Sequence, residues 1–193
     1  MVTEGMKILH VFQDFKNVMI YPHKFFQEIE DRKIKDVAIY IFIISLFVFF
    51  VNTTIANFYS QKYNFKFIPF IFIVWFSISL LSILPITILR WIHTPKEMKI
   101  YLKNNPTELQ KVVSRERSAV FKVVGYSITP IILFSMLSYI SKYFTYLSWY
   151  WIIIGTIGIS KVLKISKIEA FISLIIAYSL AVILFFEPLM LLT

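Results

Sequence analysis

The chain has 193 residues, of which 58% are apolar and 18% aromatic, with a formal net charge of +9 and no cysteine. The apolar residues are gathered in long blocks, whereas a soluble domain of this length has more charge and shorter apolar runs. The solvent for most of the chain is therefore lipid. The lack of cysteine excludes disulfides, thiolate metal sites and cysteine nucleophiles.

Five apolar runs are long enough to cross a bilayer as helices, because a hydrocarbon core of roughly 30 Å needs about 20 helical residues. The runs are too uniformly apolar for the alternating pattern of a membrane β-barrel. We predict an all-α polytopic membrane protein with an amphipathic N-terminal region over 1–36 and a five-span domain over 37–192. The predicted spans are 37–58, 67–92, 119–140, 143–163 and 169–192, with a helical loop over 93–118.

The basic residues are divided very unequally between the two sides of these spans. Of the 20 lysines and arginines, only Lys62, Lys66 and Lys142 lie on the side opposite the N-terminus. The positive-inside rule therefore predicts a cytoplasmic N-terminus and an external C-terminus in the cell membrane. The positive side is suited to anionic lipid headgroups. Acidic residues interleave with the lysines and the aromatic residues lie in the spans, so we expect no nucleic-acid partner.

The first predicted helix is amphipathic. Over residues 6–20 the side chains of Ile8, Phe12, Phe15 and Met19 recur at intervals of three and four, which gives one apolar stripe. Two positions stay open for this helix: the membrane interface, or packing against loops of the protein itself. Pro22 then suits the first turn of a second helix.

The loop between spans two and three carries two similar helix-start signals. Thr94 and Asn105 each precede a proline and stand three residues before a glutamate, which predicts two short helices with side-chain caps. Arg115 and Arg117 lie in the second of these helices. They are candidates for a cytoplasmic interaction, and a solvated charged face is the alternative.

Span three contains a helix breaker at membrane depth. Pro130 has no N–H, so the carbonyl of Tyr126 loses its helical partner, and nearby hydroxyls are positioned to replace it. This predicts a kink in span three. The kink is interpreted either as a bend that packs against neighbouring helices, or as a hinge with a polar pocket around Tyr126. Tyr178 of span five lies at a depth from which it could face that pocket. Pro85 is a similar breaker in span two. The string in span three is Gly125-Tyr126-Ser127-Ile128-Thr129-Pro130.

Span four carries small residues at three- and four-residue spacing, which lets helices approach closely. An internal packing face is one interpretation, and a face between two copies of the chain is the other. These residues are Gly155, Thr156, Gly158 and Ser160.

No enzyme signature is present in the sequence. There is no His-Glu-x-x-His, no pair of aspartates on one span and no phosphate loop. Ser127 has no histidine at its depth to act as a base. Glu187, in the outer half of span five, is read as hydrated near the outer surface, with an ion-linked role as the alternative. We therefore predict no catalytic residue, metal or cofactor.

Three stretches resemble the Yip1 domain family, and its prokaryotic members above all. They are a Pro–aromatic segment before span one, a Gly-Tyr…Pro motif in span three, and span four with the short turn into span five. In this chain they read Tyr21-Pro22-His23-Lys24-Phe25-Phe26, the string from Val120 through Gly125-Tyr126 to Pro130, and Trp149 to Gly158 followed by Ile165-Ser166-Lys167-Ile168-Glu169-Ala170.

Members of that family are five-span membrane proteins, and the eukaryotic ones act in early secretory traffic, associating with prenylated Rab-type GTPases and with one another. This chain lacks the Asp-Leu-Tyr-Gly-Pro string that precedes span one in those members. The resemblance implies a non-enzymatic membrane-organising or partner-binding scaffold, with other membrane proteins or a second copy as partners. The alternative is a transporter or lipid-handling protein that uses the broken third helix.

Overall fold

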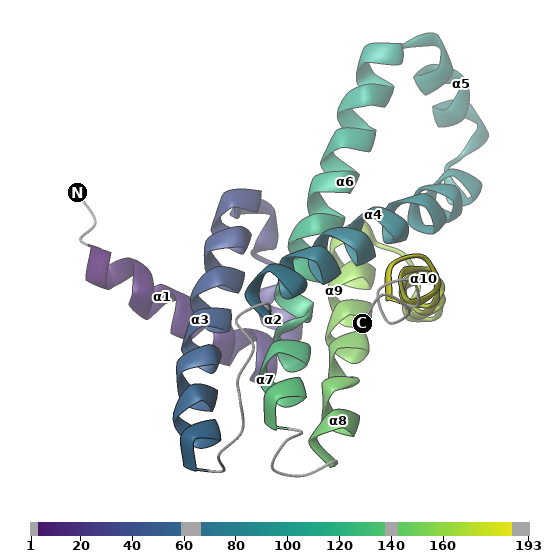
Figure 1. The fold of residues 1–193 in the computed structure, drawn as a ribbon. Coiled ribbons are helices and arrows are strands. Elements are labelled where there is room, and N and C mark those ends of the chain that lie inside the picture. The colour runs from purple at the N-terminus through teal and green to yellow at the C-terminus, as the bar shows by residue number, and fades with distance from the viewer. Residues whose placement is uncertain (1–3, 59–66, 138–142, 187–193) are drawn as a thin grey trace.

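The structure is a computed structural model that describes residues 4–58, 67–137 and 143–186 (Figure 1). All regular elements in these ranges are helical. Five stretches are long and apolar enough to cross a membrane: Ile34–Val51, Ile71–His93, Pro106–Phe134, Tyr146–Leu163 and Lys167–Leu184. The predicted all-α polytopic fold with five spans is therefore confirmed.

The N-terminal region forms α1 (Glu4–Ile20), α2 (Pro22–Phe25) and the single turn η1 (Ile29–Asp31), with Pro22 in the first turn of α2. One face of α1 is buried through Val11, Asp14 and Val18. This helix packs against α2, against the first span α3 (Ile34–Phe58) and against the third span. The sequence left open whether this helix lies in the membrane interface or packs against loops of the protein. The structure shows it packed against the protein, in contact with spans as well as with α2.

The second span is α4 (Phe67–His93), a continuous helix with Pro85 in its interior. Pro85 therefore does not divide α4 into two helices. α4 crosses the other spans at a steep angle in Figure 1 and packs against α6 and α10.

Two helices form an arm that extends beyond the rest of the bundle: α5 (Lys96–Asn104) and the first half of α6 (Pro106–Ser127) (Figure 1). Pro106 is the first residue of α6, as predicted, but neither helix has a side-chain cap. The Thr94 hydroxyl instead donates to the carbonyl of Arg90 at 2.8 Å, and the Asn105 amide donates to the carbonyl of Tyr101 at 2.9 Å. Both predicted caps are wrong because these side chains bond backward, to the helix that ends before them.

The third and fourth spans are each divided in two. α6 is followed by α7 (Thr129–Leu137), and α8 (Tyr143–Ser148) by α9 (Tyr150–Leu163). Span four thus has a discontinuity at Trp149 that the sequence analysis did not predict. The predicted end of span three at 138–140 lies outside the described residues.

The last span is α10 (Lys167–Ala181), extended by the π-helical turn η2 (Val182–Phe186). It begins with a capping box in which the Ser166 hydroxyl accepts from the N–H of Glu169, and the Glu169 carboxylate accepts from the N–H of Ser166. Glu187 and the rest of span five to 192 lie outside the described residues.

The bundle is organised around α6. This helix contacts α3, α4 and α9, so the centre of the molecule lies along its second half. In Figure 1, α3, α6 with α7, and α8 with α9 run in similar directions, whereas α10 is seen end-on and packs against α4 and α9.

Candidate functional site

At the break between α6 and α7, neighbouring hydroxyl groups donate hydrogen bonds to backbone carbonyls. The Thr129 hydroxyl donates to the carbonyl of Tyr126 at 2.5 Å, and the Ser127 hydroxyl donates to the carbonyl of Val123 at 2.6 Å. Pro130 is buried one residue further on. The carbonyl that loses its N–H partner to the proline therefore gains a side-chain donor, as the cost of an unpaired group at membrane depth requires.

A second hydroxyl completes this arrangement from another span. The Tyr40 hydroxyl of α3 lies 2.8 Å from the Thr129 hydroxyl oxygen. Because Thr129 has one proton and gives it to the Tyr126 carbonyl, Tyr40 is the donor in this bond. The break is thus tied to α3 by a chain of two hydrogen bonds.

The Tyr126 ring is packed by aromatic rings from the N-terminal half of the chain. Its side chain is 1% exposed. The ring centroid lies 4.8 Å from that of Phe25 in α2 and 4.6 Å from that of Tyr40. α2 therefore fills the space beside the broken helix, and the expected polar pocket around Tyr126 is occupied by rings.

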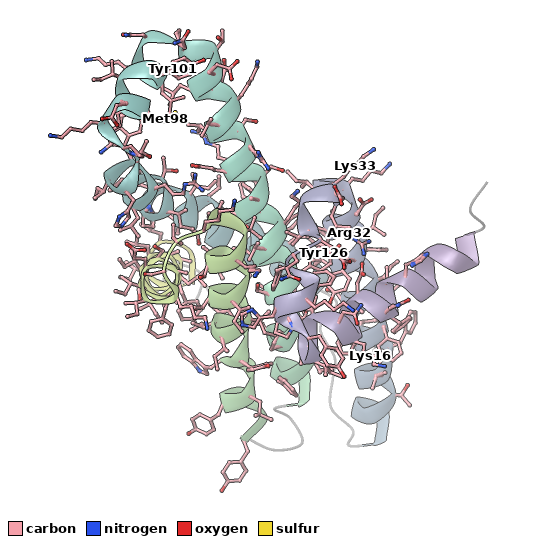
Figure 2. All side chains as sticks on the ribbon, turned by 180° about the vertical axis from the view of Figure 1, so that it is seen from behind. Lys16, Arg32, Lys33, Met98, Tyr101 and Tyr126 are labelled. Atoms are coloured by element: carbon pink, nitrogen blue, oxygen red, sulfur yellow. The ribbon has the colours of Figure 1, made fainter. Side chains whose placement is uncertain are left out.

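A charged pair lies next to this aromatic cluster. Arg32 Nη2 and Asp14 Oδ1 are 2.8 Å apart, and both residues are close enough to interact electrostatically with Tyr126; Figure 2 shows Arg32 and Tyr126 near each other. Burial raises the pKa of the Asp14 carboxyl above its ordinary value, in opposition to the lowering effect of Arg32. A polar cavity of about 260 Å³ opens here, and Phe25 also lines it.

The structure places the small residues of span four inside the bundle. A Cβ on Gly158 would meet Val123 of α6 and Phe26 at 3.0 Å or less, and one on Gly155 would meet Leu174 of α10 at 2.9 Å. Thr156 is buried, and the Ser160 hydroxyl donates to the carbonyl of Ile165 at 2.8 Å. These positions serve close packing between α9 and its neighbours within one chain.

Tyr178 of α10 lies with the indoles of span four. Its ring centroid is 5.4 Å from Trp149 and 5.7 Å from Trp151. The structure therefore does not bring Tyr178 to Tyr126, whose ring contacts are Phe25 and Tyr40. The sequence analysis missed Phe25 as a partner, because nothing in the sequence relates a residue of α2 to one 101 positions later.

A second constellation lies where the ends of α4 and α9 meet α6 and α10, and we call it the junction. Arg90 joins three helices: its Nε lies 3.0 Å from Glu116 Oε1 of α6, and its Nη1 donates to the carbonyl of Leu163 of α9 at 2.7 Å. His93 Nε2 lies 2.5 Å from Glu169 Oε1 at the start of α10. The sequence analysis did not single out these residues, although each lies within a few residues of a predicted span end.

The two arginines proposed for a cytoplasmic interaction are both exposed on α6. Arg115 lines a cavity of about 560 Å³ at the junction, together with Arg90 and Glu116. Arg117 is absent from the lining of that cavity. Of the two candidates, Arg115 therefore lies at the junction cavity and Arg117 does not.

Among the residues that the structure describes, no group of three or more His, Asp or Glu side chains lies close enough to hold a metal ion. What the arrangement offers is a packed aromatic centre and a charged junction at the helix ends. Comparisons with family models, curated proteins and solved structures gave no match, so the resemblance to the Yip1 domain family stays a prediction.

Proposed function

We propose that this chain is a non-enzymatic, Yip1-like scaffold of the cell membrane, with its N-terminus and its α5–α6 arm in the cytoplasm. In this proposal the five spans form a fixed platform, and the arm holds a protein partner against the membrane. The proposal rests on the division of basic residues along the chain and on the surface of the arm.

The surface of α5 is the observation that carries this proposal. Ile100 is 62% exposed and Tyr101 53%, on a helix that extends beyond the bundle, as Figure 2 shows for Tyr101. Large apolar side chains exposed together on a soluble arm are typical of a protein interface. Over residues 94–118 six basic residues stand against three acidic ones, so the complementary partner is a segment that carries acidic and apolar side chains.

The packing of the third span favours a scaffold over a transport path. The hydroxyl and aromatic groups at the break contact one another, with Tyr40, Thr129 and Tyr126 all buried. A transporter that used this break would need the same groups to line an open, hydrated path.

Capture of partners from native membranes tests this proposal. The full chain is compared with an Ile100→Ser/Tyr101→Ser variant and with an Ile168→Ser control, which alters an even more exposed apolar residue at the start of α10. We expect a reproducible protein partner that the α5 variant loses and the control keeps. Equal capture by all three proteins would refute the interface on α5. The absence of any reproducible partner, or robust movement of ions or lipids in proteoliposomes, would refute the scaffold.

Cysteine labelling tests the topology. Because the chain has no cysteine, a single Lys103→Cys or Lys142→Cys substitution is the only thiol present. We expect a membrane-impermeant maleimide added outside cells to label the second and not the first. The reverse pattern would overturn the orientation and, with it, the cytoplasmic arm.

A further inference from the structure

The junction contains a cavity of about 560 Å³ between η1, α4, α6 and α9. Four cationic side chains line it, against two acidic ones. The cations are Arg90, Arg115, Lys122 and Lys164, and the acids are Asp31 and Glu116. A concave site with surplus positive charge attracts an anion more strongly than the same charges on a convex surface do.

The charges are held in place by the fold. Arg90 is fixed by Glu116 and by the carbonyl of Leu163, and Lys122 is only 7% exposed on α6. Charged side chains are rarely buried this far unless they are compensated. Arg115 and Lys122 have interactions of their own, and the feature that attracts an anion is the surplus positive charge around the cavity as a whole.

An apolar cavity of about 410 Å³ adjoins the basic one. Five residues line both cavities: Arg90, Val112, Glu116, Leu163 and Lys164. The second cavity is lined further by apolar side chains that include Trp91, Leu102 and Leu109. A basic cavity next to an apolar one suits a ligand with an anionic group and an apolar part.

We propose that the junction cavity binds a phosphate group, carried either by an anionic lipid headgroup or by a soluble phosphate ester. Guanidinium and ammonium groups are the usual protein partners of phosphate. Basic pockets between spans at the cytoplasmic side bind lipid headgroups in this way. The site does not depend on the two residues proposed for the α5 interface, because Ile100 and Tyr101 line neither cavity.

Lipid retention by the purified full chain tests the proposal. The chain in uncharged detergent is titrated with dioctanoyl phosphatidic acid, with dioctanoyl phosphatidylcholine and with inorganic phosphate. Retention is read by native mass spectrometry and by the shift in the apparent unfolding temperature. The variants are Arg115→Gln and Lys164→Asn, since Asn tolerates the left-handed backbone of Lys164 at φ 55°. Lys111→Gln is the matched control, an exposed lysine elsewhere on α6.

We expect phosphatidic acid to bind in preference to phosphatidylcholine, with each site variant weakening it about tenfold and the Lys111 control leaving it unchanged. Displacement by millimolar inorganic phosphate would support a soluble phosphate ligand, and resistance to it would support a lipid headgroup. Equal binding of the two lipids would overturn the site. A control variant that loses as much affinity as Lys164→Asn would also overturn it, because the attraction would then be general surface charge.

Discussion

The break in span three and the junction are both places where several helices meet, and they are built in opposite ways. At the break, Phe25, Tyr40 and Tyr126 pack ring against ring. At the junction, Arg90 and Glu116 meet beside a cavity. Aromatic rings fill space, whereas charged groups need solvent or counter-charges around them. The rings at the break are thus packed against one another, whereas the charged groups at the junction line a cavity of about 560 Å³.

The largest expected effect is at the break. Gly125→Val should lower the free energy of unfolding by about 3 kcal/mol, because its side chain would enter space held by Val37 and by the Trp75 indole, whose Nε1 lies 2.8 Å from the position of a Cβ. Gly155→Ala is the contrast: its new Cβ meets the flexible end of Leu174, and leaving glycine gains about 1 kcal/mol of helix propensity. Unfolding in detergent measures both; similar losses would show that the break is no more tightly filled than its surroundings.

Removal of the hydroxyl that serves the break should come next. Thr129→Val takes away the side-chain donor to the Tyr126 carbonyl and the acceptor for Tyr40, at a cost of about 2 kcal/mol. Pro130→Ala returns a backbone N–H to that carbonyl, so the same Thr129 substitution should cost less in the Pro130→Ala background. A double-mutant cycle measures this coupling. Strictly additive effects would mean that the hydroxyl does not replace the missing N–H.

The junction should be less sensitive than the break. Arg90→Gln loses the ion pair with Glu116 and the bond to the Leu163 carbonyl, and we expect a loss of about 1 kcal/mol because Arg90 is partly exposed. Glu108→Gln breaks the fully surface-placed pair with Lys111 and should cost below about 0.5 kcal/mol. The apparent unfolding temperatures of these variants test the predicted order of stability losses. If Arg90→Gln proved more harmful than Gly125→Val, the contrast between the two regions would be reversed.

The smallest effect concerns pH. The raised pKa of Asp14 in the folded protein means that the folded state binds this proton more tightly than the unfolded chain does. The stability that this bound proton contributes is therefore fully present below the ordinary carboxyl pKa of about 4, and it is lost as the pH rises through the raised pKa of Asp14. Asp14→Asn should flatten the dependence of the unfolding temperature on pH above the ordinary carboxyl pKa. An unchanged slope in Asp14→Asn would contradict the role of burial at this carboxyl.

The sequence predicted the features that depend on neighbours along the chain. Five spans follow from run length, and the break at Gly125–Pro130 follows from the missing N–H of Pro130. Its hydroxyl donor, Thr129, is also local. The Ser166-x-x-Glu169 capping box was equally readable and was overlooked.

The predictions that failed depend either on a choice between two local hydrogen bonds or on tertiary contacts. Thr94 and Asn105 have the right spacing for caps, but each has a free helical carbonyl four residues earlier, and the local bond backward is the one that forms. Depth in the membrane places Tyr178 level with Tyr126, but depth does not fix which way a helix faces. The pairing of Arg90 with Glu116 depends on how α4 and α6 pack, which no periodicity in either segment specifies.

The reach of α2 into the bundle has a consequence for biosynthesis. Phe25 and Phe26 leave the ribosome early, whereas Tyr126 and Gly158, against which they pack, are made about a hundred or more residues later. Phe25 and Phe26 can therefore reach their final packing only after the third and fourth spans have been inserted. The packing of α2 against the bundle is then a late step of assembly. A chain truncated before α9 would leave Phe26 without its contact at Gly158, and this exposed aromatic side chain would favour misfolding.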